Sequence, residues 1–433
     1  MMRVKLFLKR FSTLVIASTI LVGCSNGMTS GQSIDGTKIT AWAWDPNFNI
    51  KALEVAEKVY NKEQDNNIDL EIVENAQDDI VQKLNTVLSS GVNDALPNIV
   101  LIEDYRAQSF LISYPDSFFP LTNFIKTDDF ASYKIASSSL NGKNYAIPFD
   151  SGVAGLYVRK DILEQTGYTI DDITNVTWDD ILKVGQAIFK KTGVKLLSTD
   201  TNAGTLIRGM LQSSGSWYTR LDGVTPYLEN NASLKEAFQT IKMMNESGVF
   251  YIHHNWSEML KAFNTGIVAT VPSGNWITPS ITAEESQSGN WVVVPWPKQK
   301  IGGSVNASNL GGASLYVINK EGKEAAADFL AKTFGSSADF YQEILTQIGA
   351  IGTFLPAEET EAYNQKVEYF GGQEIYKDFS DWSKQIPIVN YGKSTYAMED
   401  IVVKALNQYL EGDDLDTVLT DAQKSAENQV KSQ

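Results

Sequence analysis

The chain has 433 residues but only one cysteine and two histidines, which excludes several kinds of site at the outset. Cys24 alone provides no thiol pair for a disulfide and no cysteine cluster for zinc. His253 and His254 are adjacent, whereas a helical zinc motif places its two histidines four residues apart. The glycine pairs form no dinucleotide-binding fingerprint, and no Ser-His-Asp arrangement is readable. We therefore predict no metal and no cofactor.

Positive charge is also scarce, with 36 Lys and Arg against 52 Asp and Glu and a formal net charge of -16. Because binding to nucleic acid needs clustered basic side chains against the phosphates, we predict no nucleic-acid partner. The acidic excess favours a solvated surface rather than a specific acidic site. The sequence contains neither a fixed-period repeat nor a low-complexity block beyond one short segment near the N-terminus.

The first residues differ in composition from the rest of the chain. MMRVKLFLKR carries four positive charges and no acid, and the 12-residue apolar run 11–22 follows it. The run is too short for an ordinary membrane-spanning helix and predicts the apolar region of a secretory signal peptide. It ends in Leu21-Val22-Gly23-Cys24, which resembles a bacterial lipobox; the alternative is a plain signal peptide with a chance cysteine.

The lipobox resemblance implies that residues 1–23 are a lipoprotein signal peptide and that Cys24 carries a diacylglyceryl group. Two acyl chains suffice for stable membrane anchoring. Residues 25–36, SNGMTSGQSIDG, are polar, small and Gly-rich, so residues 24–36 are predicted to form a flexible tether. The expected location is the outer face of the cytoplasmic membrane, attached through the N-terminal lipid.

Helix and strand periodicities alternate beyond the tether. Strands are predicted over 38–44, 68–74 and 98–104, with helices over 50–62 and 78–91 between them. This βαβαβ series predicts an α/β fold with a parallel sheet covered by helices on its faces. Later helices show N-terminal caps, Thr177 with Asp180 and Ser233 with Glu236, and the part from about residue 358 is predicted mostly helical.

Polar and aromatic residues gather where two of these strands end. In ITAWAWDPNFN, Trp42 and Trp44 share one strand face and Asp45 follows them, and the third strand ends in Glu103 and Asp104. Ligands bind beyond the carboxyl ends of parallel strands, so these residues are candidates for a binding site. We prefer Trp44 to Trp42 because it is nearer the end of the strand. The alternatives are a turn or helix-start role for Asp45 before Pro46, and helix N-terminal capping by Glu103 or Asp104.

Six further stretches together resemble, in order, the sugar-binding lipoproteins of bacterial ABC importers, the family-1 extracytoplasmic solute-binding proteins. The opening WAWDPNFN is most similar to the subgroup for lactose, arabinose or related oligosaccharides. The six stretches are LPNIVLIEDYR, NGKNYAIPFDSGVAGLYVRKDILEQTGY, TWDDILKVGQAI, AFNTGIVATVPSGNW, NLGGASLYVINKEGKEAAADFLAKTF and IGTFLPA.

The resemblance implies a two-lobe, periplasmic-binding-protein-like fold of class II, with the ligand in a cleft between the lobes. Lobe one is expected at 37–147 and 306–352, and lobe two at 148–305 and 353–433. The implied function is capture of a mono- or oligosaccharide, as a monomer without chemistry of its own, and its delivery to the permease subunits of an ABC transporter.

A sugar presents patches of C–H bonds, which match aromatic faces, and hydroxyl groups, which match carboxylates, amides and backbone groups. On that basis the remaining site candidates stand at the lobe boundary or in loops. Glycine is included because its missing side chain lets the backbone approach a ligand. These remaining candidates are Asp150 in PFDSG, Trp217 in the Gly/Ser-rich GSWY, Trp256 in NWSEML, Asn275 and Trp276 in SGNW, Gly312 in LGGAS, and Tyr391.

Two other classes of extracellular protein are alternatives to a binding protein. A glycoside hydrolase needs two carboxyl groups facing each other about 5–10 Å apart. Glu103 and Asp104 are neighbours that would point to opposite faces of a strand, although Asp45, Asp150 and Glu103 could converge. A surface adhesin would not need a cleft. The sequence favours a binding protein and not an enzyme.

Overall fold

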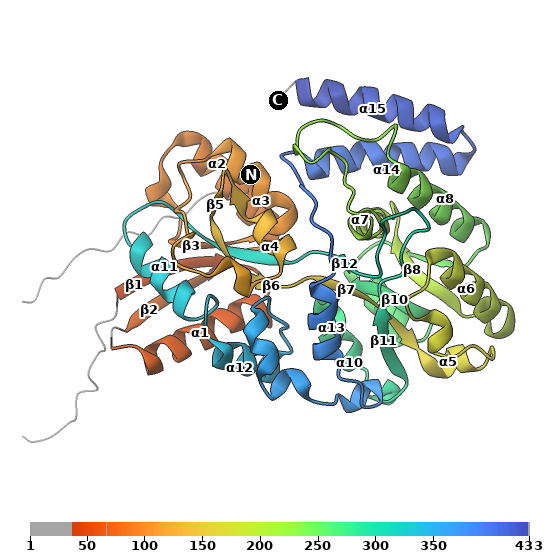
Figure 1. Cartoon of the computed structure of the whole chain (residues 1–433), viewed down its shortest axis with the longest axis horizontal. Coiled ribbons are helices and arrows are strands. Elements are labelled where there is room, and N and C mark those ends of the chain that lie inside the picture. Colours follow the sequence, from red (N-terminus) through yellow and green to blue (C-terminus); the bar gives the residue numbers. More distant parts are fainter. Residues whose placement is uncertain (1–36, 66, 432–433) are drawn as a thin grey trace, which may run out of the picture. The chain divides into compact units, whose positions relative to one another are not determined.

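The computed structural model describes residues 37–65 and 67–431, so Cys24, the predicted signal peptide and the predicted tether lie outside the described residues. The described chain contains two larger β-sheets with helices on both faces of each (Figure 1). We call the five-stranded sheet with its helices lobe one, and the six-stranded sheet with its helices lobe two.

The sheet of lobe one has the strand order β2-β1-β3-β13-β6. β1 pairs in parallel with both β2 and β3, which confirms the predicted parallel βαβαβ unit. β13 then pairs antiparallel with β3 and β6, so the complete sheet is mixed. The elements of lobe one are β1 (Thr37–Ala43), α1 (Asn49–Glu63), β2 (Ile68–Glu74), α2 (Gln77–Ser90), β3 (Ile99–Glu103), α3 (Asp104–Ser113), α4 (Ser132–Ser137), β4 (Ser139–Leu140), β5 (Lys143–Asn144), β6 (Ala146–Asp150), β13 (Ala313–Val317), α11 (Lys323–Lys332) and α12 (Ala338–Ile348).

Successive side chains of a strand point to opposite faces of the sheet, and apolar side chains on both faces of this sheet pack against helices. Ile39, Ala41 and Ala43 of β1 pack in one cluster with α1, α11 and α12. Val100 and Ile102 of β3 point the other way and pack with α2 and α3. Both faces are therefore covered, and the ends of the strands stay available for a site.

The sheet of lobe two has the order β11-β7-β10-β8-β9, with β12 pairing to β7. Its helices again divide between the two faces, with α9, α10 and α13 on one side and α5 to α8, α14 and α15 on the other. The elements are β7 (Val153–Arg159), α5 (Lys160–Glu164), α6 (Trp178–Thr192), β8 (Lys195–Asp200), α7 (Gly204–Ser213), α8 (Ala232–Glu246), β9 (Phe250–His253), α9 (Trp256–Asn264), β10 (Val268–Gly274), α10 (Thr278–Thr282), β11 (Trp291–Pro295), β12 (Ser308–Asn309), α13 (Ile375–Ser383), α14 (Thr395–Glu411) and α15 (Leu415–Lys431).

Two predicted helix caps have different outcomes. Thr177 and Asp180 form the expected capping box at the start of α6. The predicted cap of α8 was wrong, because Asn231, and not Ser233, accepts the backbone N–H of Leu234 at 3.1 Å. Ser233 lies inside the helix and is buried. Asparagine and serine cap helices about equally well, so a cap at Asn231, two residues before the predicted one, serves the helix as well as Ser233 would.

The chain crosses between the two sheets between β6 and β7 and again between β12 and β13. The boundaries predicted from the sequence, 147/148 and 305/306, each precede a crossing by a few residues. The two crossing segments touch at Gly152, which has φ 61°: a Cβ there would stand 2.6 Å from Asn309 Oδ1 and 2.8 Å from the Gly312 nitrogen. Only glycine fits this close approach of two backbones.

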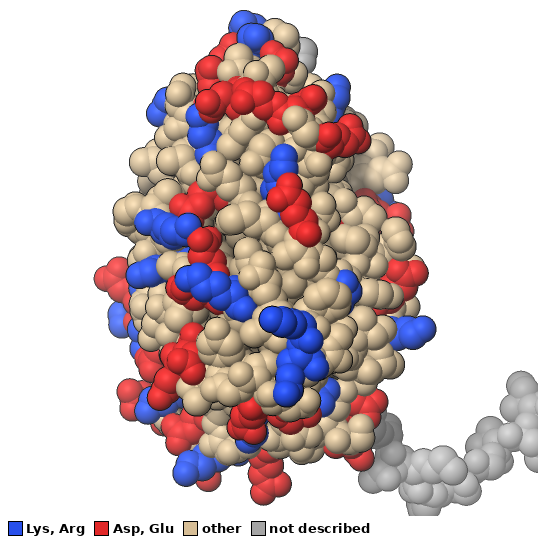
Figure 2. Space-filling model, turned by 90° about the vertical axis from the view of Figure 1, so that its right-hand side faces the viewer, with Lys and Arg blue, Asp and Glu red and all other residues tan. Residues whose placement is uncertain are grey.

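On the face that Figure 2 shows, acidic and basic side chains are interspersed among the other residues. Within residues 37–65 and 67–431, no helix combines the length and the apolar character needed to cross a membrane. No group of three or more His, Cys, Asp or Glu side chains in the same residues is arranged to hold a metal ion.

Candidate functional site

A cavity of about 870 Å³, which we call the cleft, is lined by both lobes and by the segments that cross between them. The strand ends and helix starts of lobe one face those of lobe two across it. The lining residues are Trp44, Asp45, Asn47, Phe48, Asn49, Gln77, Glu103 and Ile348 of lobe one, Trp256, Leu260, Asn264, Trp276, Pro279, Ser280 and Ala283 of lobe two, and Asp150, Gly311, Gly312 and Ala313 at the crossings.

The cleft brings together most of the residues singled out in the sequence. Trp44, Asp45, Glu103, Asp150, Trp256, Trp276 and Gly312 all line it. Asp104, Trp217, Asn275 and Tyr391 do not. The lining residues without a counterpart among the candidates include four amides, which are Asn47, Asn49, Gln77 and Asn264.

Trp44, and not Trp42, lines the cleft on the lobe one side. Trp42 packs toward α2, and the Lys83 ammonium lies 5.5 Å from the centroid of its ring. Asp45 follows Trp44 in the left-handed conformation, with φ 57°, and its Oδ1 accepts the backbone N–H of Asn47 at 3.0 Å. The turn at Asp45 and its position in the cleft are therefore compatible, because the turn is what carries the chain across the end of the sheet.

Trp276 is the most firmly held aromatic side chain of the cleft. It follows β10, and its indole N–H donates to the Leu310 carbonyl oxygen at 2.8 Å. A Cβ on Gly274 would stand 2.3 Å from Nε1, so the indole lies directly against the backbone of β10. Since its polar edge is already bonded, what Trp276 offers a ligand is its ring.

Trp256 extends this aromatic wall. It begins α9, is 51% exposed, and its ring centroid lies 6.0 Å from that of Trp276 with the planes inclined by 33°. Asn255 caps the helix by accepting the backbone N–H of Glu258 at 3.0 Å. The two indoles of lobe two thus stand side by side, one fixed and one exposed, with Trp44 on the other lobe.

Two carboxyl groups of the cleft are strongly influenced by burial. Burial raises the pKa of Asp150 to about 6, and the nearby Lys134 charge acts against the rise. Burial also raises the pKa of Glu103, opposed by a 2.6 Å hydrogen bond from the Tyr396 hydroxyl and by the charges of Arg208 and Arg106. No Lys or Arg side chain is among the described residues that line the cleft.

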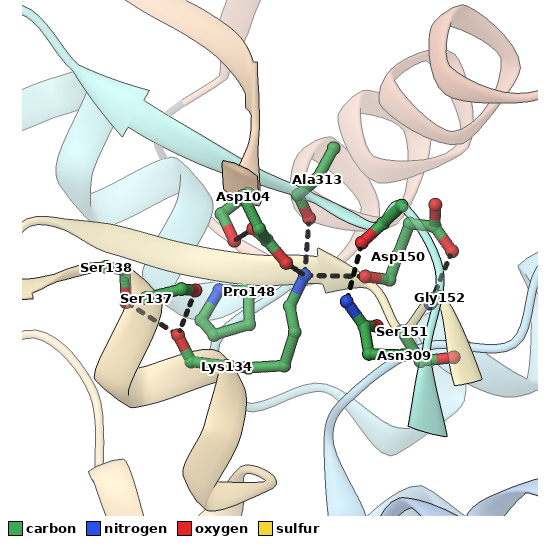
Figure 3. Close-up of polar contacts among 12 residues, drawn as sticks. Asp104, Lys134, Ser137, Ser138, Pro148, Asp150, Ser151, Gly152, Asn309 and Ala313 are labelled. Carbon is green, nitrogen blue, oxygen red and sulfur yellow. Dashed lines mark hydrogen bonds and ion pairs between the residues drawn. The ribbon is translucent and has the colours of Figure 1, made fainter. Parts of the chain in front are cut away.

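Asp104 is committed to a buried ion pair behind the cleft (Figure 3). Lys134 is fully buried, and its ammonium contacts the Asp104 carboxylate and donates to the carbonyl oxygens of Asp150 at 2.7 Å and Ala313 at 3.1 Å. Ser314 donates to the other Asp104 oxygen at 2.9 Å. A buried pair of this kind requires all its hydrogen bonds to offset desolvation, so Asp104 holds β6, β13 and α4 together and is not presented to a ligand.

Asn275 likewise lies behind the wall of the cleft. It is 2% exposed, and its amide group donates to the Ser151 hydroxyl at 2.5 Å. The interaction joins the turn after β10 to the first crossing segment. Its neighbour Trp276 occupies the lining position that the sequence motif suggested for both residues.

Trp217 and Tyr391 are buried in lobe two, where they pack against each other and against Tyr105 from α3 of lobe one. The centroid of the Tyr105 ring lies 5.5 Å from that of Trp217 and 4.8 Å from that of Tyr391. The Trp217 indole N–H donates to the Thr395 hydroxyl at 3.0 Å. The Gly/Ser-rich loop had suggested an aromatic facing a ligand, but the ring that it faces belongs to another part of the same chain.

Asn264, at the end of α9, is a cleft residue that sequence reasoning missed. Its side-chain oxygen is buried and accepts no hydrogen bond from any described residue. A buried amide oxygen without a partner is costly, and a donor from a ligand would remove that cost. The only sequence signal was an asparagine at the helix end in AFNTG, a position that capping explains equally well.

Two α/β lobes linked by crossing segments, with a cleft of aromatic faces, amides and carboxylates between them, define a binding protein of the kind that serves membrane importers. The chain belongs to the bacterial extracellular solute-binding protein family, whose profile matches residues 57–371. The family consists of binding proteins rather than enzymes, and it places this protein outside the cytoplasm.

Comparison with individual proteins agrees with this assignment. The chain is 40% identical over 426 residues to a lactose-binding protein of Rhizobium radiobacter, covering 98% of this chain and 99% of the relative. It is 27% identical over 332 residues to an arabinooligosaccharide-binding protein of Bacillus subtilis (strain 168), covering 75% of each. The structure of the sugar-binding protein MalE from Xanthomonas citri has the same fold, with a TM-score of 0.75 at 16% identity over 92% of this chain and 98% of that one.

Proposed function

We propose that the cleft captures a neutral saccharide, a disaccharide or short oligosaccharide of the lactose type, for delivery to the permease of an ABC importer. The observation that carries the proposal is the composition of the cleft. Indole rings from both lobes face it, beside amides and carboxylates, and no basic side chain lines it among the described residues.

This composition suits an uncharged sugar. The rings of Trp44, Trp256 and Trp276 match the C–H faces of pyranose units. The amides both donate to and accept from sugar hydroxyl groups, and the carboxylates accept from them. A sugar acid or sugar phosphate would bring its negative charge close to Asp150 and Glu103 with no cation on the wall to offset it. The lactose-binding and arabinooligosaccharide-binding relatives support the same substrate class.

The two lobes are proposed to close around the sugar. A ligand that contacts both lobes binds the closed arrangement more tightly, so its binding energy shifts the population toward that arrangement. The permease would then recognise the closed, loaded form of a monomer. Cys24, outside the described residues, is proposed to carry the lipid that keeps the protein at the outer face of the cytoplasmic membrane.

A thermal-shift screen of neutral and acidic saccharides tests the proposal. A ligand at about 100 times its Kd stabilises the native state by about 2.7 kcal/mol, which a melting curve resolves. We expect stabilisation by lactose or by neutral arabinooligosaccharides and none by digalacturonic acid of similar size. Stabilisation by the acid alone, or by no neutral member of the panel, would contradict the proposed substrate class.

A further inference from the structure

The N-terminal turn of α3 extends from lobe one into lobe two. Tyr105 packs against both Trp217 and Tyr391, which also contact each other. Its hydroxyl donates to the Asn309 carbonyl oxygen at 3.1 Å and accepts the Gly311 N–H at 3.2 Å. Asn309 ends β12 and Gly311 belongs to the crossing segment. The start of α3 is therefore anchored to the other lobe at the same place where the chain crosses.

Glu103 immediately precedes α3 and lines the cleft. The Tyr396 hydroxyl, from α14 of lobe two, donates to its Oε2 at 2.6 Å, and Arg106 Nε lies 3.4 Å from the same oxygen. The Glu103 side chain is only 15% exposed. Its second oxygen, Oε1, accepts no hydrogen bond from the described residues and remains available to a ligand.

Tyr396 is itself held between two cations. The Arg106 guanidinium lies 4.1 Å from the centroid of its ring, and the Arg208 guanidinium lies 5.9 Å away. Arg208 is fixed by two contacts with the Glu399 carboxylate, at 2.5 and 2.7 Å. The position of the Tyr396 hydroxyl is thus determined by packing and by charges on both lobes, which makes it a rigid donor.

We propose that Tyr396 is a positioning residue for sugar binding, which orients the Glu103 carboxylate of the opposite lobe so that its free oxygen faces the ligand. The proposal rests on the proposed function. In this proposal the Glu103 carboxylate has the orientation needed for binding only while α3 and α14 are in contact. Its orientation therefore depends on the relative position of the two lobes.

The same contacts control the charge of Glu103. Burial raises the pKa of its carboxyl group, while the Tyr396 hydrogen bond, Arg208 and Arg106 lower it, and Asp104 acts with burial. Without the Tyr396 hydroxyl, the pKa of Glu103 rises further, because a stabiliser of the ionised form is lost. An acceptor that is ionised at neutral pH forms the stronger hydrogen bonds to sugar hydroxyls.

The first test uses the sugar-free protein and compares Tyr396→Phe with Tyr409→Phe. Tyr409 is on the same helix, and its hydroxyl makes no hydrogen bond to a described residue, so it is a matched control. We expect NMR titration of the Glu103 side-chain carboxyl carbon to show a higher pKa in Tyr396→Phe and an unchanged pKa in Tyr409→Phe. An unchanged pKa in Tyr396→Phe would overturn the proposal, whatever ligand the protein takes.

The second test measures the Kd for lactose by calorimetry. Tyr396→Phe is expected to bind about tenfold more weakly than wild type at pH 7, and Tyr409→Phe to bind as wild type does. Glu103→Gln should lose a similar factor, and the double variant should be no weaker than Glu103→Gln, because the two residues act as one unit. Independent, multiplied losses would overturn the proposal.

These outcomes separate the proposed function from the proposed positioning role of Tyr396. If wild type binds no neutral saccharide, the proposed function fails, while the sugar-free titration still decides whether Tyr396 positions Glu103. If wild type binds lactose and Tyr396→Phe matches it in both tests, the function stands and the positioning role is wrong. Melting curves of each variant check that the substitution has not altered folding.

Discussion

The indole N–H of Trp276 donates to the carbonyl oxygen of Leu310 at 2.8 Å, which ties the aromatic wall of the cleft to the segment that crosses between the lobes. Gly311, the next residue, lines the cleft, and a Cβ placed on it would lie 3.3 Å from the indole nitrogen. A ligand stacked on Trp276 therefore rests on a ring whose position is set by the crossing segment.

Trp276→Ala is expected to weaken lactose binding about 30-fold, since truncating a desolvated aromatic anchor costs roughly 2 kcal/mol or more of binding free energy. The unfolding free energy should fall by only about 1 kcal/mol, mainly through the lost hydrogen bond. Calorimetric titration and urea denaturation measure the two effects.

The control for this prediction is Trp217→Ala. Trp217 is 2% exposed and lies outside the cleft lining, so its truncation should cost about 3–5 kcal/mol of folding stability. If Trp276→Ala instead collapses the melting transition and binds normally when folded, Trp276 is a core residue and the proposed binding surface is wrong.

Asp150→Asn tests the pH dependence of the cleft. The pKa of Asp150 is raised to about 6 from 3.8, mainly by burial, so the folded state holds an extra proton between about pH 4 and pH 6. The stability of the sugar-free protein should consequently fall as the pH rises through this window, by roughly 2 to 3 kcal/mol from this group. The Asn variant should lack this fall.

Sugar binding should show the opposite dependence, because an ionised carboxylate is the better acceptor for a hydroxyl. At pH 5 about a tenth of Asp150 is ionised, so lactose should bind about tenfold more weakly than at pH 7. In Asp150→Asn this drop should be absent. An affinity profile that is equally steep in the variant would show that another group causes it, with Glu103 the first to examine.

Asn264→Leu should weaken lactose binding about tenfold and leave the sugar-free protein as stable as wild type or more so. The reason is that the buried amide oxygen has no partner among the described residues, so its replacement removes an uncompensated polar group. Asn245→Leu, at an exposed position near the end of α8, is the matched control and should change neither quantity. Strong destabilisation by Asn264→Leu would mean that the amide is satisfied by the protein itself.

Gly152→Ala should destabilise the protein by about 3 kcal/mol or more, because a Cβ would press on both the Asn309 side chain and the Gly312 backbone in a left-handed conformation. Gly91→Ala, with φ 71° and nothing within 4 Å of the added carbon, should cost only about 1 kcal/mol. Urea denaturation compares the two. Equal losses would indicate that the crossing segments separate to admit a methyl group.

Cys24→Ala is expected to release the protein from the membrane, since the proposed lipid is attached through that sulfur. Fractionation of cells that produce the variant, with immunodetection in the membrane and soluble fractions, measures the effect. Ser25→Ala, next to the lipobox, is the control and should remain with the membrane. A Cys24→Ala variant as firmly bound as wild type would contradict the lipid-anchor proposal.

Local periodicity was enough to predict the elements that build the cleft. Alternation in IDLEIVE and the helical spacing in DDIVQKLNTVLSSG correspond to β2 and α2, and α2 ends at Gly91 as expected. Because parallel strands place their carboxyl ends at one edge, Trp44 and Glu103 could be assigned to one site without a structure.

Contacts between distant segments could not be predicted in this way. Asp104 stands at a strand end beside Glu103, yet it pairs with the buried Lys134, which lies thirty residues further along the chain. Trp217 and Tyr391 look like loop aromatics until the structure packs them against each other and against Tyr105. In each case the partner is polar or aromatic and remote in sequence, so neither composition nor spacing indicates the pairing.

The measurement that tests the central claim most directly is calorimetric titration of the purified protein with lactose, followed by analysis of the sugar after a day of incubation. We predict saturable binding at one site per chain and recovery of intact lactose, with the binding heat largely lost in Trp276→Ala. Release of galactose and glucose that depends on the protein would contradict the account, and so would the absence of binding to lactose and to every neutral oligosaccharide tested.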